Sequence, residues 1–507
     1  MVAFRKLGSL AAFLAAAALF YCPAFSQTAP DLVIINAKAR TLVSAGSTAE
    51  AVSIRNGKIS AVGTTRRISA LAGPKTRIID AKGRLVLPGF NDAHIHFMAL
   101  GNMFSSIDLR NARSEVDAVS KIAHYAKFLP KNRWILGGGW TSENWMPAGL
   151  PTKDLIDPVT PDNPVFIYHA DTKSALANTL ALKLAGISTK TDGVEMNLKG
   201  EPTGILRGAA LAAVARAIPT GHINDWSAIA ETATNYAASF GVTSVTDTQS
   251  DEHASVYRNL ENAGKLKTRI YDCASLPYLP KKVNFTLADR DSEKMVRTGC
   301  VKGSAEGGQE DAELLLKDVI RADKAGFQVL VHAIGSEANS RVIDIFEKTA
   351  RANGKKDRRF RIEHTHGTAE TDIARIARSG IIASSQPYLF RGSPVESEAF
   401  RRFIDLGSPV AFGADAPMTD LDPMLGIHAA VIPITGNGMS AYKAVRAYTV
   451  GSAFAEFQER AKGTIEVGKL ADLIILSDDI FEIEPAKIID ATVLLTIVNG
   501  RVVYEAQ

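Results

Sequence analysis

The sequence predicts an α/β protein whose main domain is a (β/α)8 barrel of the TIM type, with a β-sandwich domain formed from both termini and an inserted subdomain. Two observations lead to this prediction. Between residues 88 and 460, short apolar runs alternate with helical patterns, which is the order of elements in a parallel barrel. Both ends of the chain are rich in short β signals separated by turn residues, which favours antiparallel sheets.

Eight candidate strands lie in the middle of the chain. They are 90–97, 241–247, 267–273, 300–303, 328–333, 359–364, 381–387 and 409–415, with helical patterns such as 311–325 and 336–352 between them. About 140 residues separate the first two strands, far more than a crossover helix requires. We therefore expect residues 104–225 to form a subdomain inserted after the first strand of the barrel domain 88–460.

The predicted sandwich domain combines residues 27–87 with residues 461–507. Its apolar runs are 32–35, 51–54, 59–62, 77–80, 471–476 and 493–498, and its turn pairs are Asn56-Gly57, Lys82-Gly83 and Asn499-Gly500. Asn-Gly between two apolar runs is a strong signal for a hairpin.

The first 26 residues have the pattern of a secretory signal peptide. Arg5 and Lys6 precede an apolar run that ends at Tyr21, and a small-x-small site ends at Ser26. The run is too short for a stable membrane span. We therefore expect an exported, periplasmic protein with no membrane span after cleavage; an uncleaved N-terminal anchor is the alternative.

Composition and charge exclude some partners. The chain has 46% hydrophobic and 22% charged residues, which is ordinary for a folded soluble protein. Its 58 basic and 54 acidic residues give a formal charge of +4, which argues against nucleic acid or an anionic membrane surface as a partner. A small-molecule substrate is the partner we expect, and a homodimer is left open. Cys273 and Cys300 could pair in an oxidising compartment; two buried free thiols are equally compatible with the sequence.

Histidine, lysine and aspartate side chains end several of the candidate strands. They are His94, His96, Lys302, His332, His364 and Asp415. Side chains two apart on a strand point to the same side, so His94 and His96 can reach one cation. The C-terminal strand ends are where a barrel does its chemistry. Singly, a terminal histidine is often structural, and Asp415 could cap a helix that starts near Pro417.

These residues lie in motifs that carry a family resemblance. The motifs are Pro88-Gly-Phe-Asn-Asp-Ala-His-Ile-His96, Val331-His-Ala-Ile-Gly335, Arg361-Ile-Glu-His364, Gly413-Ala-Asp-Ala-Pro417, Gly241-Val-Thr-Ser-Val-Thr-Asp247 and Lys462-Gly-Thr-Ile-Glu-Val-Gly-Lys-Leu-Ala-Asp-Leu473. Through them the chain resembles the amidohydrolase superfamily (amidohydrolase family 3), in the group that includes N-substituted formamide deformylase.

The resemblance implies a metal centre of two divalent ions, with zinc as the expected metal. By analogy His94, His96 and Asp415 would hold the first ion, His332 and His364 the second, and Lys302 would bridge them as a carbamate formed with CO₂. An ordinary lysine is a cation that cannot bind metal, but two nearby dications would favour the neutral amine that reacts with CO₂. An unmodified Lys302 in a salt bridge is the alternative.

The activity that the resemblance implies is hydrolysis of a carbon–nitrogen bond other than a peptide bond. A hydroxide bridging the two ions would attack the substrate, and Asp415 would accept its proton and deliver it to the departing amine. One alternative is the same metal centre acting on a lactone or a phosphoester. Another is a degenerate, non-catalytic binding protein of the envelope, because the loop after Lys302 is shorter than the family usually has.

Four further residues are candidates for substrate binding. Trp140 could offer an aromatic face, Lys173 and Arg207 could bind an anionic group, and His366 follows His364 by two positions. Each has a plain alternative: Trp140 in the subdomain core, Arg207 in a surface contact and His366 facing solvent. Lys173 stands where relatives often carry histidine.

Overall fold

A sheet of eight parallel strands forms the centre of the structure, a computed structural model that describes residues 29–142, 145, 151–170, 173–219, 225–248, 253–277, 290, 292–306, 308–392, 394–433 and 438–506. The strands are β8 (Phe90–Ile95), β15 (Val242–Thr248), β16 (Arg269–Ser275), β17 (Val296–Ser304), β18 (Gln328–Ile334), β19 (Arg361–His366), β20 (Ile382–Ser385) and β21 (Val410–Phe412). Their order in the sheet is their order in the chain, and each pairs in parallel with the next.

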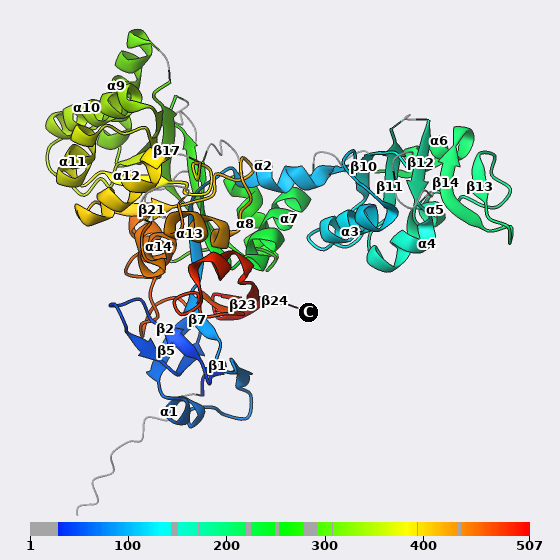
Figure 1. The fold of residues 1–507 in the computed structure, drawn as a ribbon, viewed down its shortest axis with the longest axis horizontal. Helices are drawn as coiled ribbons and strands as arrows, with labels where there is room; N and C mark the ends of the chain where they lie inside the picture. The colour runs from blue at the N-terminus through cyan, green and yellow to red at the C-terminus, as the bar shows by residue number, and fades with distance from the viewer. Residues whose placement is uncertain are drawn as a thin grey trace, which may run out of the picture.

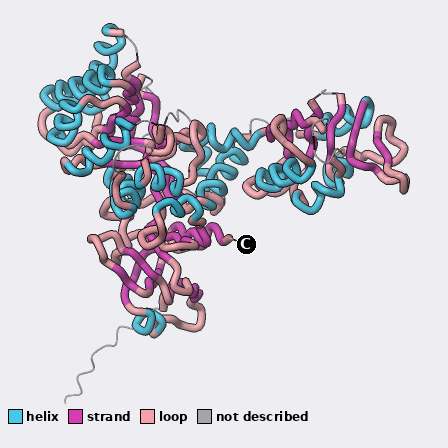
Figure 2. The backbone as a smooth tube through the Cα atoms, in the orientation of Figure 1, coloured by secondary structure: helices cyan, strands magenta, loops and turns pink. Residues whose placement is uncertain are grey.

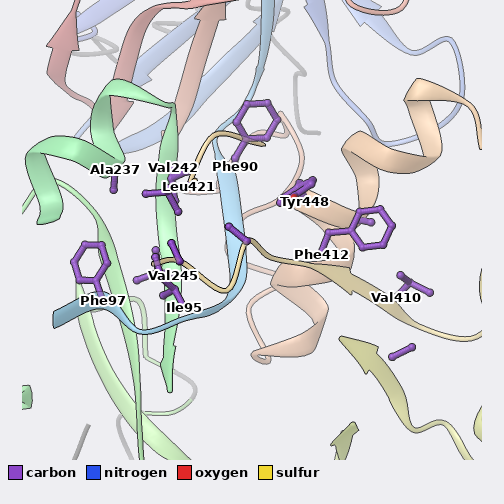
Figure 3. Packing of buried hydrophobic residues seen from close by; sticks show 14 of the residues in the cluster. Phe90, Ile95, Phe97, Ala237, Val242, Val245, Val410, Phe412, Leu421 and Tyr448 are labelled. Atoms are coloured by element: carbon purple, nitrogen blue, oxygen red, sulfur yellow. The ribbon is translucent and has the colours of Figure 1, made fainter. Parts of the chain in front are cut away.

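The first and last strands of this sheet meet and close it into a barrel. Just beyond β21, the backbone N–H of Asp415 donates to the carbonyl of His94 (2.8 Å), and the N–H of His96 donates to the carbonyl of Ala416 (2.9 Å). Outside the seam the ring of Tyr448 contacts both Phe90 and Phe412, with centroids 6.3 and 5.6 Å apart (Figure 3). The predicted barrel is confirmed.

Helices alternate with the strands and cover the barrel (Figure 2). They include α7 (Trp226–Ser239), α8 (Ala254–Asn262), α9 (Gln309–Lys324), α10 (Ser336–Asn353), α11 (Glu370–Ser379), α12 (Pro394–Asp405) and α13 (Pro423–Val431). In α10, Val342, Ile343, Phe346 and Thr349 are buried. This spacing places them on one face of the helix, and that face packs on the strands.

A β-sandwich is built from both ends of the described chain. One sheet has the order β5-β4-β1-β6 and consists of β1 (Leu32–Ile35), β4 (Ala51–Arg55), β5 (Lys58–Gly63) and β6 (Arg77–Asp80). The other has the order β24-β23-β22-β7-β2-β3 and consists of β2 (Lys38–Arg40), β3 (Thr48–Ala49), β7 (Leu85–Pro88), β22 (Leu473–Leu476), β23 (Val493–Val498) and β24 (Arg501–Glu505). Ile34 and Val52 of the first sheet share a buried cluster with Val86 and Ile475 of the second.

An inserted lobe follows β8 and lies beside the barrel, reached through α2 (Phe97–Asn102) (Figure 1). Its sheet has the order β13-β14-β12-β11-β10-β9. These strands are β9 (Ile107–Asp108), β10 (Ile135–Trp140), β11 (Val165–His169), β12 (Ser174–Ala177), β13 (Val194–Met196) and β14 (Pro202–Arg207), with α3 (Glu115–Ala126), α4 (Lys153–Ile156), α5 (Thr179–Leu184) and α6 (Gly208–Ala217) against them. Phe104 and Phe128 contact Tyr236 of α7, with ring centroids 5.1 and 4.7 Å apart.

We propose that the domain boundaries follow these regions: 27–87 with 461–507, and 88–460 with the insertion 104–225. The expected signal peptide, residues 1–26, lies outside the described residues. Among the helices of the described ranges, none combines the length and apolar character needed to cross a membrane.

Cys273 of β16 and Cys300 of β17 form a disulfide inside the barrel. The two residues are paired neighbours on adjacent strands, with Cα atoms 4.6 Å apart, and both are buried. Of the two alternatives that the sequence leaves open, the structure has the bonded pair.

The N-terminal end of the barrel contains a buried ionic cluster. Arg297 of β17 pairs with Glu456, and Lys462 Nζ lies 2.5 Å from Glu456 Oε1. Asn91 of β8 also donates to Glu456 (2.6 Å). Burial would raise the pKa of Glu456, but Lys462 and Arg297 outweigh it and lower that pKa. Each charge in this cluster therefore faces an opposite charge.

Candidate metal centre

Six side chains meet at the C-terminal end of the barrel, and they are the six that the sequence predicts to hold metal. His94 lies near the end of β8 and His96 directly after it, Lys302, His332 and His364 lie on β17, β18 and β19, and Asp415 follows β21. Parallel strands of a closed sheet end on the same rim. This topology brings together residues that are more than 300 positions apart.

Three of these residues form a group that could hold one cation. Asp415 Oδ1 lies 3.5 Å from His94 Nε2 and 3.5 Å from His96 Nε2. One nitrogen or oxygen atom of each residue lies within 4.8 Å of the others. A divalent cation among these atoms would need only small adjustments of the side chains to reach bonds of about 2.0–2.2 Å.

The other three residues adjoin this group. Lys302 Nζ lies 3.3 Å from His94 Nε2. The ring of His364 lies beside the ring of His94 and that of His332, with centroids 4.8 and 4.4 Å apart. The six side chains therefore form one continuous cluster.

Hydrogen bonds select the nitrogen that three of the histidines can offer to a cation. The Nδ1 atoms of His94, His96 and His364 lie 2.5, 3.1 and 2.8 Å from Glu363 Oε2, the Thr248 carbonyl and Gln386 Oε1. All three partners are acceptors, so each Nδ1 carries the proton and each Nε2 keeps a lone pair. An acceptor behind the histidine is the usual arrangement at metal sites.

His332 has the opposite arrangement. Its Nε2 lies 2.9 Å from Oε1 of Glu306, a carboxylate whose side chain is 72% exposed. Glu306 lies in the short segment that follows Lys302.

The backbone is strained at this rim. His364, Thr365 and Asp415 have φ angles of 77°, 52° and 59°, in the left-handed region that residues other than glycine rarely adopt. Such strain persists only where the surrounding structure enforces it, and it is frequent at functional sites.

Burial shifts the protonation of the cluster. It lowers the pKa of Lys302 to about 8 and raises the pKa of Asp415 to about 6. Burial, with Lys302 nearby, also lowers the pKa of His94 and brings that of His364 to about 3. Both imidazoles are therefore neutral and able to bind a cation.

These residues fit a divalent cation. In the part of the chain that the structure describes, the buried Oδ1 of Asp415 has no hydrogen-bond donor. Neutral imidazole nitrogens and a carboxylate oxygen are the ligand atoms that zinc prefers. A buried acceptor without a donor, beside the imidazoles of His94 and His96, is an arrangement that a cation could complete.

The sequence reasoning missed the residues behind the histidines, namely Glu363, Gln386, Thr248 and Glu306. A signal for Glu363 was present. Arg361 and Glu363 are two apart on β19 and so share a face of the strand, which would be a costly pair in a barrel core without a polar partner.

Of the four candidate substrate residues, three lie in the inserted lobe, whereas His366 lies on β19 two positions after His364. Trp140 is 1% exposed and packs in the core of the lobe with Trp145, as its plain alternative describes. Arg207 pairs with Glu195 of the lobe (2.8 Å), and Lys173 is exposed before β12. His366 ends β19 and stacks on Phe390 at 4.1 Å.

Comparisons with known proteins find a matching family, relatives and a similar structure. Residues 77–504 match the model of the amidohydrolase family. The chain is 31% identical to Protein LONG AFTER FAR-RED 3 of Arabidopsis thaliana, over 94% of this chain and 91% of that protein. It is 27% identical to N-substituted formamide deformylase of Arthrobacter pascens, over 94% and 98%. An uncharacterized metal-dependent hydrolase from Pyrococcus horikoshii has a similar structure, with a TM-score of 0.60, 24% identity and coverage of 90% and 99%.

Proposed function

Because this chain belongs to the amidohydrolase family, we propose that its metal-dependent hydrolytic site cleaves an amide-type C–N bond other than a peptide bond. The observation that carries the proposal is the cluster of four histidines, Lys302 and Asp415 at the rim of the barrel. The similarity to N-substituted formamide deformylase over nearly the whole chain supports this bond type.

The cofactor that we propose is a pair of divalent cations, with zinc as the metal. His94, His96 and Asp415 would hold the first, and His332 and His364 the second. Lys302, as a carbamate formed with CO₂, would bridge them, and its lowered pKa supports this role because the neutral amine is the form that reacts. Bound cations would polarise the substrate carbonyl and make a water molecule more acidic.

Asp415 would move the proton in this reaction. Its carboxylate lies beside His94 and His96, and its Oδ1 is open to a new partner. It would accept a proton from the water that adds to the substrate carbonyl, and would deliver that proton to the nitrogen as the C–N bond breaks. The products would be a carboxylate and an amine.

We also propose a compartment and partners. The buried Cys273–Cys300 disulfide supports an exported, periplasmic protein, since such bonds persist in oxidising compartments. The partner would be a small-molecule substrate, and a homodimer remains a proposal from the sequence.

A substrate panel tests the proposed bond type. Zinc-loaded protein is assayed on N-substituted formamides and other amides, on lactones and on phosphoesters. We expect turnover of an amide with release of the amine. Faster turnover of a lactone or phosphoester would favour the alternative electrophile. Absence of both bound zinc and turnover would favour a non-catalytic binding protein.

A further inference from the structure

Glu363 is a buried carboxylate in direct contact with the candidate metal centre. It lies on β19 with a side chain that is 0% exposed, and its Oε2 is 2.5 Å from His94 Nδ1. Ser384 donates to the same oxygen from β20 (2.7 Å). Glu363 is too far inside the barrel wall to be a surface group, so its charge must be compensated within the core.

Arg361 compensates that charge. Its Nε lies 2.8 Å from Glu363 Oε1, and its Nη2 lies 3.1 Å from Oε2. Arg361 is itself buried, so this two-point contact pairs the carboxylate with an opposite charge inside the core. The carboxyl therefore stays ionised, and both of its oxygens act as acceptors only.

The other half of the centre has a weaker arrangement. The Nδ1 of His364 faces Gln386 Oε1, a neutral amide oxygen, and His332 faces the exposed carboxylate of Glu306. An anionic acceptor raises the basicity of a histidine more than a neutral acceptor does, and an exposed carboxylate is screened by water. The two halves are therefore unequal in the groups that support their histidines.

We propose that Glu363, held by Arg361, is a positioning residue of the metal centre that makes the His94–His96–Asp415 half the tighter cation site. Glu363 keeps the proton of His94 on Nδ1. The lone pair therefore stays on Nε2, and this nitrogen becomes a stronger ligand for the cation. The His332–His364 half, supported by Gln386, is the weaker site and fills second. This inference rests on the proposed metal-dependent function.

The substitution Glu363→Gln isolates this role. Glutamine has the same shape but a single oxygen, and both Arg361 and His94 require an acceptor at this position. If the oxygen stays with Arg361, the amide NH₂ faces His94 and forces its proton onto Nε2, which then cannot bind a cation. Glu363→Asp keeps the charge and should recover part of the affinity.

Zinc affinity of the full chain is the measurement, by competition with a chromogenic chelator, with cobalt(II) absorption reporting the ligands. We expect two binding steps in the wild-type protein. Glu363→Gln should weaken the tighter step by about 10–100-fold, the usual cost of losing such a partner. The matched control is Glu456→Gln, another buried carboxylate paired with arginine but at the opposite end of the barrel; its folded fraction should bind zinc as the wild type does.

A second substitution tests the inference at the His332–His364 half of the centre. Gln386→Glu gives His364 an anionic acceptor and should tighten the weaker step. The inference is overturned if folded Glu363→Gln binds the first zinc as tightly as the wild type, or, should that variant not fold, if Gln386→Glu leaves the weaker step unchanged. Failure of the wild-type protein to bind any zinc would instead contradict the proposed function itself.

Discussion

The two ends of the barrel each bury a polar cluster, and the clusters differ in one respect. At the N-terminal end, Glu456 lies against Arg297 and Lys462, so opposite charges are in contact. At the C-terminal end, Asp415 Oδ1 is buried without a donor in the described part of the chain, beside neutral imidazoles. In the first cluster the charged groups have partners of opposite charge within the protein. The second contains a group of side chains, His94, His96 and Asp415, that could hold a cation.

Because of this difference, we expect substitutions at one end of the barrel to affect stability and substitutions at the other end to affect function. Substitutions at the N-terminal end should reduce the free energy of unfolding while the folded protein keeps its affinity for zinc. Substitution of Asp415 at the C-terminal rim should reduce activity with little effect on unfolding, because its buried Oδ1 has no donor and so adds little stability.

Asp415→Asn should have the largest effect. Asparagine cannot accept the proton, so we expect kcat to fall by about 10³-fold, within the range for loss of a general base and equal to about 4 kcal/mol. Zinc content, measured by elemental analysis, should be retained. Turnover equal to that of the wild type would contradict the proton shuttle.

Glu456→Gln should have the next largest effect, on stability alone. It leaves Arg297 and Lys462 buried without their carboxylate, which should cost about 3–5 kcal/mol. Urea unfolding followed by circular dichroism measures this loss. If Glu456→Gln left the free energy of unfolding unchanged but abolished zinc binding, the assignment of stability to the N-terminal end and of function to the C-terminal end would be wrong.

Removal of the disulfide tests the region between the clusters. Cys273 and Cys300 are 27 positions apart, so Cys273→Ala with Cys300→Ala should lower the free energy of unfolding by roughly 3 kcal/mol. Zinc bound per folded molecule should not change. Two free thiols detected in the denatured, unreduced wild-type protein would contradict the bond.

The smallest predicted effect concerns the pH dependence of Lys302 modification. Its pKa is lowered to about 8 by burial, and only the neutral amine, which increases as pH rises, reacts with CO₂. At fixed dissolved CO₂, zinc reconstitution of metal-free protein should recover activity about 16-fold faster at pH 8 than at pH 6.5, as the neutral fraction requires. Recovery that is independent of CO₂ would favour an unmodified lysine.

The barrel and the six rim residues could be predicted from sequence for a physical reason. Each apolar run ends in a polar residue, and parallel strands place their C-terminal ends on one rim, so the topology supplies the convergence of His94 with Asp415. No such rule relates an inserted lobe to the barrel, so the strand pattern does not specify where Trp140 and Arg207 lie relative to the rim. Glu306 and Gln386 lie on connections whose paths the strand pattern does not specify.

Crystallography with anomalous data at the zinc edge tests the central claim most directly. We predict two anomalous peaks at the rim, one among His94, His96 and Asp415 and one at His332 and His364, with added density on Lys302 Nζ between them. Absence of any peak at these side chains in protein crystallised with zinc would contradict the account.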